Sequence, residues 1–169
     1  MDHSYETYLL SDDGVYPNNE RLVVVVYQQV FIAEPSVDPD IIERQFNKNG
    51  WVNCWRNGIY REHHYHSSAH EVLGIYSGWI KTQLGGPDGK MVVAGAGDAI
   101  IIPAGVAHKN LDQSADFRVI GGYPQGQLWD INFGKAGERP LADEKINNVP
   151  LPLKDPVFGT SGPIKTLWG

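Results

Sequence analysis

Three histidines and one glutamate, placed in two short segments of the chain, have the residue types of a metal site. The four residues are His64, His66, Glu71 and His108. Imidazole nitrogens and a carboxylate oxygen form a ligand set that suits a divalent transition metal. Such a set accepts iron, manganese, nickel, copper and zinc, so we predict one bound ion whose identity the sequence does not decide. A histidine pair alone would be a weak signal, because histidines on strands are more often solvated or hydrogen-bonded.

The spacing of the first three residues predicts that an extended chain brings them together. His64 and His66 are separated by one residue. Side chains alternate faces along a strand, so both imidazoles project from one surface about 7 Å apart. The small residues at 67–69 allow the chain to bend. Glu71 then begins a second apolar strand, whose first side chain can face the same interior as the two histidines.

A predicted turn brings the fourth residue to the same place. Pro103 presets φ and Gly105 supplies conformational freedom, so His108 starts a strand that returns toward the first segment. Asn110 and Asp112 lie at even offsets from His108 and would share its face. Either is therefore a candidate to contact and orient a ligand of the metal.

The same alternation predicts which neighbouring side chains face the interior. Tyr60 and Glu62 lie at even offsets from His64, so they are expected to face the interior as it does. They are candidates for contact with a substrate, and a packing or rim position is the alternative. His63 and His70 are expected to point away. His70 sits beside the bend, where alternation can fail, and is therefore the reserve ligand.

Both segments resemble the paired motifs of the cupin superfamily. The first motif, G-x5-H-x-H-x4-E-x6-G, is matched over residues 58–78 by Gly58, His64, His66, Glu71 and Gly78. The second, G-x5-P-x-G-x2-H-x3-N, is matched over 97–112 by Gly97, Pro103, Gly105 and His108, with Asp112 in place of the asparagine. The resemblance implies an RmlC-like jelly roll, and it keeps all four ligand positions of the superfamily.

Further stretches resemble the YjlB-type single-domain bacterial cupins, from about Asp12 to Tyr123. They are Pro17-Asn18-Asn19, Asn49-Gly50-Trp51, residues 64–78, Leu84-Gly85-Gly86 and Ala96-Gly97-Asp98. This resemblance implies a fold and carries no assigned reaction. The part of the chain after Tyr123 is matched less closely.

The patterning predicts a single all-β domain over residues 1–169, a cupin jelly-roll β-barrel. The 19 glycines and 11 prolines lie among short apolar runs, as in an antiparallel protein. These runs number about eight, as in a two-sheet jelly roll. We expect an N-terminal arm over 1–19, the barrel over 20–123 and a C-terminal extension over 124–169.

Local signals predict three elements within the barrel. One short helix is expected near residues 39–49, with Asp38 as its N-cap and Gly50 at its end. Asn57-Gly58 is typical of a two-residue hairpin turn and would join 51–56 to 59–66. The β-branched run 22–31 is expected to form a barrel strand or the edge of a dimer.

The C-terminal extension is rich in proline, glycine and aromatic residues. We expect an arm packed on the barrel or on a second subunit, with an active-site lid as the alternative. A barrel with an apolar outer sheet face would bury it by homodimerising, since isologous dimers are the commonest oligomers. A homodimer is therefore expected.

Composition excludes several classes of partner. A formal net charge of −6 argues against nucleic acid, whose phosphates call for clustered lysine and arginine. No apolar run approaches the roughly 20 residues that span a bilayer, and the first residues lack the pattern of a signal peptide. We expect a soluble, cytoplasmic protein without a membrane partner.

Cys54 is the single cysteine, which excludes an intramolecular disulfide. Its thiol is expected to be buried and inert.

These features leave three classes of function. The leading hypothesis is a metal-dependent, dioxygenase-like enzyme acting on a small polar organic molecule in the barrel, because four protein ligands leave positions open on an ion that prefers six. The second is a metal-dependent isomerase or decarboxylase, in which the metal polarises a carbonyl. The third is a non-catalytic small-molecule binding protein or sensor. A metal-free epimerase ranks last, because it would leave four converging ligands without a purpose.

Overall fold

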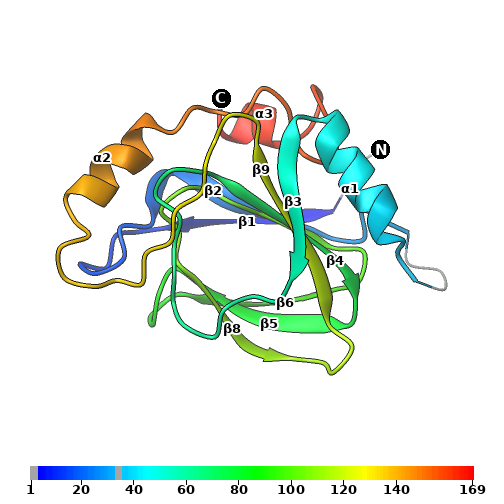
Figure 1. Cartoon of the computed structure of the whole chain (residues 1–169), viewed down its shortest axis with the longest axis horizontal. Helices are drawn as coiled ribbons and strands as arrows, with labels where there is room; N and C mark the ends of the chain where they lie inside the picture. The colour runs from blue at the N-terminus through cyan, green and yellow to red at the C-terminus, as the bar shows by residue number, and fades with distance from the viewer. Residues whose placement is uncertain (1–3, 33–35) are drawn as a thin grey trace.

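The structure, a computed structural model, describes residues 4–32 and 36–169. These residues form nine strands in two antiparallel sheets that lie one above the other (Figure 1). The larger sheet has the order β1 (Tyr5–Leu10), β2 (Asn19–Tyr27), β7 (Ala99–Ile102), β4 (Glu71–Ser77), β9 (Arg118–Pro124) and β3 (Trp51–Asn57). The smaller sheet has the order β6 (Lys90–Gly95), β5 (Trp79–Leu84) and β8 (His108–Gln113). The predicted all-β cupin jelly roll is confirmed, although the two sheets do not close into a continuous barrel.

The central strands of the larger sheet are buried on both faces, and the sequence of β2 shows why. Val24 and Val26 point into the core between the two sheets, while Val25 and Tyr27 point into a second core on the outer face. An uninterrupted β-branched run is what a strand with two buried faces requires. Because β1 and β7 pair with β2 on either side, it is a barrel strand and not the edge of a dimer.

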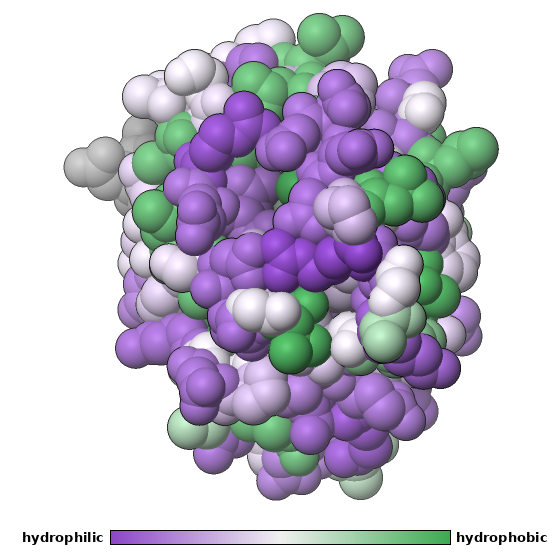
Figure 2. Space-filling view, turned by 90° about the vertical axis from the view of Figure 1, so that its left-hand side faces the viewer, coloured by the Kyte–Doolittle hydropathy of each residue, from purple (hydrophilic) through white to green (hydrophobic). Residues whose placement is uncertain are grey.

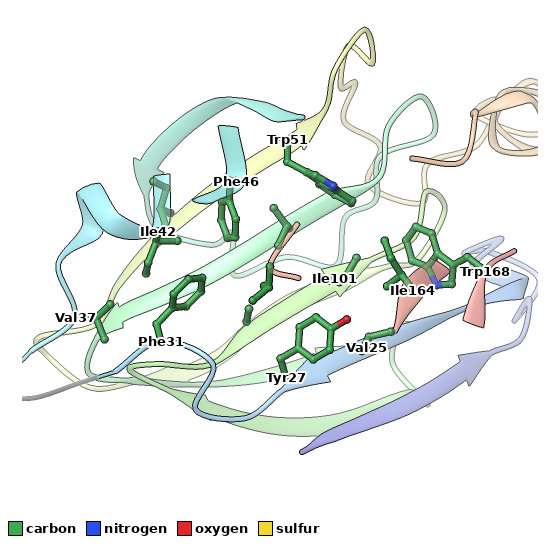
Figure 3. Close-up of a cluster of buried hydrophobic side chains, with 14 of the residues drawn as sticks. Val25, Tyr27, Phe31, Val37, Ile42, Phe46, Trp51, Ile101, Ile164 and Trp168 are labelled. Atoms are coloured by element: carbon green, nitrogen blue, oxygen red, sulfur yellow. The ribbon is translucent and has the colours of Figure 1, made fainter. Parts of the chain in front are cut away.

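Other parts of the same chain cover the outer face of the larger sheet. The helices α1 (Pro39–Lys48) and α3 (Ile164–Leu167) lie over it (Figure 1). Phe46 of α1 and Trp168, just after α3, lie among the buried side chains of this outer core (Figure 3). The face that was expected to drive homodimerisation is therefore already covered, and the homodimer itself stays a prediction.

The predicted helix is found at α1, within one residue of its expected end. The Asp38 carboxylate accepts a hydrogen bond from the Asp40 backbone N–H at 2.9 Å, which caps the first turn. Gly50 follows the helix with a φ of 78°. The helix α2 (Leu141–Asn148) and α3 were not expected. No helix in the described ranges is long and apolar enough to cross a membrane.

The predicted hairpin at Asn57-Gly58 is wrong, because neither residue has the positive φ that such a turn requires. β3 pairs with β9 instead. Residues 59–66 then run as an extended segment, which forms an isolated bridge between His64 and His108 at the start of β8. This segment replaces the predicted strand and contacts β8 of the smaller sheet through backbone hydrogen bonds.

The predicted N-terminal arm contains a strand that the sequence analysis did not predict. β1 forms the edge of the larger sheet and pairs antiparallel with β2. Residues 1–3 of the arm lie outside the described residues. The side chains of β1 are largely exposed, which is typical of an edge strand.

The side of the molecule seen in Figure 2 is covered mainly by hydrophilic residues, with hydrophobic residues in small separate groups. Large contiguous apolar patches mark protein interfaces. The described residues on this side do not form such a patch, so this side offers no apolar surface for the expected homodimer.

Candidate metal centre

Three imidazoles meet between the end of the extended segment and the start of β8. The backbone of His64 pairs with that of His108 in both directions, at 3.2 and 2.9 Å. Gly105 donates a hydrogen bond to the His66 carbonyl oxygen at 2.8 Å. One ring nitrogen from each of His64, His66 and His108 lies within 4.8 Å of the others, and all three side chains are buried.

Each of these histidines is oriented by a backbone carbonyl oxygen. His64 Nδ1 lies 2.9 Å from the Glu62 oxygen, and His108 Nδ1 lies 3.0 Å from the Val106 oxygen. His66 Nδ1 contacts the carbonyl oxygen of Asp130. A carbonyl oxygen only accepts hydrogen bonds, so every Nδ1 carries a proton and the neutral ring presents the lone pair of Nε2. This is the tautomer that binds a metal through Nε2.

Glu71 adds a carboxylate to the three imidazoles. It is the first residue of β4, pairs with Ile102 of β7 and is 3% exposed. Its Oε2 lies 3.1 Å from His108 Nε2 and 3.4 Å from His66 Nε2. While both rings are neutral, this buried oxygen has no hydrogen-bond donor among the described residues, because each neutral ring carries its proton on Nδ1.

The charges of the site favour a cation at its centre. Burial, together with the nearby charge of His108, lowers the pKa of His64 to about 3, so this ring is neutral at physiological pH. Burial alone would raise the pKa of Glu71, but the positive charge that His66 carries when it is protonated holds this pKa well below its usual range. Burial lowers the pKa of His66, and the Glu71 charge reverses this into a net rise. The donor set therefore fits a divalent transition metal.

A buried asparagine and a glycine place the turn that carries His108. Asn18 Oδ1 accepts a hydrogen bond from the Ala107 N–H at 3.0 Å. Gly105 has a φ of 94°, and a Cβ there would lie 2.3 Å from the Asn18 carbonyl oxygen. The close approach thus requires glycine, and the two contacts fix the backbone immediately before His108.

His70, the reserve ligand, is turned away from the centre, and His63 also points elsewhere. His70 Nδ1 accepts a hydrogen bond from the Ala104 N–H at 2.9 Å, and its ring packs on Trp168. Burial lowers the pKa of His70 to about 4. His63 packs its ring against Tyr16. Alternation therefore holds for both residues, and His70 supports the turn before His108.

The metal centre lies in a cavity of about 540 Å³. The cavity is lined by Asn53, Trp55, Asn57, Gly58, Ile59, Tyr60, His64, His66, Glu71, Leu73, His108, Tyr123 and Trp129. Such a volume is typical of pockets for small organic molecules. The centre is thus open to a ligand and is not a closed structural site.

A β-bulge in β3 points two of the lining residues into the cavity. The pairing of β3 with β9 shifts between Val52 and Trp55, and Asn53 has a φ of 55°. The extra residue reverses the alternation, so Trp51 lies in the outer core while Trp55 lines the cavity. Regular alternation would have placed both tryptophans on one face.

The other predicted site residues have different positions. Tyr60 lines the cavity, with its ring 5.1 Å from that of His64. Glu62 has an exposed side chain, and only its backbone carbonyl orients His64. Asn110 is buried but donates to Gln113 Oε1 at 2.6 Å and does not line the cavity.

The prediction that Asp112 shares the face of His108 is wrong, because Asp112 is exposed. The pairing of β5 with β8 shifts after Asn110: Thr82 pairs with Asn110, whereas Lys81 pairs with Asp112. This bulge reverses the alternation between Asn110 and Asp112. The superfamily motif has an asparagine at this position, and here the residue is not part of the site.

Two residues of the C-terminal extension contribute to the candidate site and were not predicted from the sequence. Trp129 lines the cavity, and the Asp130 carbonyl oxygen orients His66. The Asp130 carboxylate also accepts a hydrogen bond from the Ser67 N–H at 2.6 Å, and Tyr65 and Asn132 form an isolated bridge. The extension thus packs on the barrel, as expected of an arm, and also completes the site. No local motif marks these residues.

Comparisons with known proteins give the following similarities. The chain is 39% identical over 168 residues to "Uncharacterized protein YjlB" of Bacillus subtilis (strain 168), covering 99% of both chains. No protein-family model matches it. Among solved structures it is similar to an acireductone dioxygenase from Bacillus anthracis with a cadmium ion in its active center, at 17% identity, a TM-score of 0.41 and coverage of 76% of this chain and 82% of that one. It is also similar to procruciferin, an 11S globulin from Brassica napus, at 18% identity and a TM-score of 0.38, covering 78% of this chain and 27% of that longer one.

Proposed function

The chain belongs to the YjlB family, and from the site that it carries we propose that it is a metal-dependent, dioxygenase-like enzyme that acts on a small organic molecule in the cavity. The proposed ligands of the metal are His64, His66, Glu71 and His108. The proposed metal is a divalent transition ion, and iron is one of the ions that this donor set accepts.

One observation carries the proposal. Three Nε2 lone pairs and the partnerless Glu71 Oε2 converge in a buried space. Lone pairs directed at one another repel, and a buried oxygen without a donor costs free energy. A proton on His66 relieves part of this cost in the metal-free protein. A divalent cation bound to all four donors relieves the whole of it.

The surroundings of the centre support a reactive site. Four protein ligands leave positions open on an ion that prefers six, and the cavity gives a ligand access to them. A ferrous ion bound there supplies Lewis-acid and redox chemistry. Glu71 lowers the positive charge of the centre, while Leu73 and Trp129 shield it from bulk water. The tethered histidines keep the donors in place before any ligand arrives.

Metal binding is tested first, by elemental analysis and by competition titration with zinc on protein purified without a histidine tag. We expect about one ion per chain and, in His108→Ala, a loss of affinity on the order of 100-fold or more. His63→Ala is the matched control, because this imidazole packs on Tyr16 outside the site. Equal zinc affinity in the wild type and in His108→Ala would contradict the proposal.

The proposed dioxygenase-like activity is tested on protein loaded with ferrous iron under anaerobic conditions. Nitric oxide, which occupies an open position on iron, should give an electron paramagnetic resonance signal in the wild type and none in His108→Ala. Small molecules that co-purify, identified by mass spectrometry, are then tested for iron-dependent oxygen uptake. Anaerobic turnover with manganese or zinc would instead favour an isomerase or decarboxylase. Tight retention without any product would favour a binding protein or sensor.

A further inference from the structure

The walls of the cavity above the metal centre are aromatic and lack cationic side chains. From these walls we infer that the natural ligand is a planar, conjugated molecule with two neighbouring oxygen donors and without a phosphate or other multiply charged group. This inference rests on the proposed function, because the oxygen donors are meant for the metal. It narrows the ligand to a chemical class that the metal centre alone does not specify.

One wall is a pair of stacked rings. The rings of Tyr123 and Trp129 lie 6.1 Å apart between centroids with an interplanar angle of 17°. The Trp129 ring is also 5.7 Å from that of His66, and its side chain is 49% exposed. Trp129 therefore stands at the mouth of the cavity beside a predicted ligand. A flat molecule bound to the metal can lie against this wall, where aromatic stacking adds to the area it buries.

The back of this wall is held rigid. Trp55 Nε1 donates a hydrogen bond to the Tyr123 hydroxyl oxygen at 2.7 Å. A Cβ at Gly121 would lie 2.3 Å from the Trp55 ring, so the ring lies directly on the backbone of β9. The contacts that hold Trp55 and Tyr123 come from the protein itself, so binding does not have to order these two side chains. Tyr60 supplies a further ring beside His64.

The charges of the lining exclude phosphorylated ligands. Among the described residues that line the cavity there is no lysine or arginine, and Glu71 is the single carboxylate. Phosphate groups in proteins are held by arginine, lysine or helix N-termini. The polar groups beyond the centre are the uncharged amides of Asn53 and Asn57. An anionic group that reached past the metal would therefore lose its hydration without a compensating partner.

The test uses zinc-loaded protein and three probes: catechol, lactate and phosphoglycolate. Each affinity, measured by isothermal titration, is divided by the affinity of the same probe for zinc in water. We expect the corrected affinity for catechol to exceed that for lactate by about 10-fold, and phosphoglycolate to bind most weakly. Trp129→Ala should lower catechol affinity on the order of 5- to 10-fold without changing zinc content. Trp79→Ala is the matched control: this tryptophan is 42% exposed and lies outside the cavity lining.

The outcomes separate this inference from the proposed function. If the protein takes up zinc but binds the three probes with equal corrected affinities, the inference is overturned and the metal site stands. The same holds if Trp129→Ala and Trp79→Ala lose the same amount of catechol affinity. Failure of the wild-type protein to take up zinc overturns both. Tighter binding of phosphoglycolate than of catechol would show that cationic side chains from outside the cavity lining reach the ligand. This result would also overturn the inference.

Discussion

Main-chain carbonyl groups orient the three clustered histidines. Because the Glu62 and Val106 contacts are made by backbone oxygens, the tautomer of each ring depends on the path of the chain and not on the neighbouring side chain. This differs from sites in which a carboxylate side chain orients the histidine. It also means that the identity of residue 62 is free to vary.

Replacing Glu62 tests this arrangement directly. In Glu62→Ala the exposed carboxylate is lost, while the carbonyl that accepts from His64 Nδ1 remains. Zinc affinity, measured by competition with a chelator, should change by less than about 2-fold, whereas loss of a contact that truly orients a ligand costs about 10- to 100-fold. His64→Ala serves as the comparison that must lose binding. A large loss in Glu62→Ala would place its side chain in the site.

Cys54 illustrates how burial controls the chemistry of one side chain. Its thiol is half-buried beside the outer core, and burial raises its pKa to about 11 from an ordinary value of 9.0. The thiolate is the reactive form, so at pH 8 the folded protein should react with iodoacetamide about 100-fold more slowly than the chain unfolded in urea. The rate should rise as pH approaches 11. Equal rates in the folded and unfolded chain at pH 8 would contradict this pKa.

At the scale of elements, the turn between β7 and β8 decides where His108 lies. Pro103, Gly105 and the contacts from Asn18 and His70 hold this turn. The position of His108 in the candidate metal centre therefore depends on residues that are not predicted ligands.

Gly105→Ala should disturb the centre through this turn. The added Cβ would lie 2.3 Å from the Asn18 carbonyl oxygen, so the turn must shift and zinc affinity should fall on the order of 10- to 100-fold. Gly126→Ala is a close control, because Gly126 has a similar φ of 84° but no atom within 4 Å of the added Cβ. Both variants should lose about 1–2 kcal/mol of unfolding free energy from the positive φ, and only Gly105→Ala should lose zinc affinity. Equal zinc binding in the two would show that the turn does not position His108.

At the scale of the whole molecule, the C-terminal extension joins the two faces of the larger sheet. On the outer face, the buried Asp155 carboxylate accepts hydrogen bonds from the Val157 and Phe158 N–H groups at 2.8 and 3.0 Å and from the Tyr27 hydroxyl. Near the cavity, the same extension contributes Trp129 and Asp130. Docking of this extension is therefore required both for stability and for a complete site.

Tyr27→Phe tests the anchoring contact without altering the shape of the core. The substitution removes one donor from a fully buried carboxylate, and the unfolding free energy measured in urea should fall by about 1.5–3 kcal/mol. Tyr5→Phe is the control: this tyrosine is 41% exposed and packs on Tyr27, so its change should stay within about 0.5 kcal/mol. Equal losses in the two variants would show that the Asp155 contact does not stabilise the extension.

Local patterns were sufficient to predict several features of this protein. The types and spacing of His64, His66, Glu71 and His108 predicted that these side chains meet, as they do in the structure, and the cap and end signals around residues 39–49 predicted α1. The four valines of β2 indicated a strand, either in the barrel or at the edge of a dimer, and the structure has the barrel strand. Each of these predictions depends either on residues that are close together in the chain or on the chemistry of a side chain. Neither the local sequence nor the side-chain chemistry changes with the surrounding fold.

Only the tertiary structure decided how distant segments meet. The bulge after Asn110 reverses the alternation that predicted Asp112 on the face of His108, and the bulge at Asn53 puts Trp51 and Trp55 on opposite faces of β3. Residues 59–66 pair with β8 although Asn57-Gly58 favoured a hairpin. Strand pairing and bulges are selected by side-chain packing between segments far apart in the chain, which outweighs local preferences of at most about 1 kcal/mol. For the same reason, no local pattern could show that Trp129 and Asp130 reach the centre.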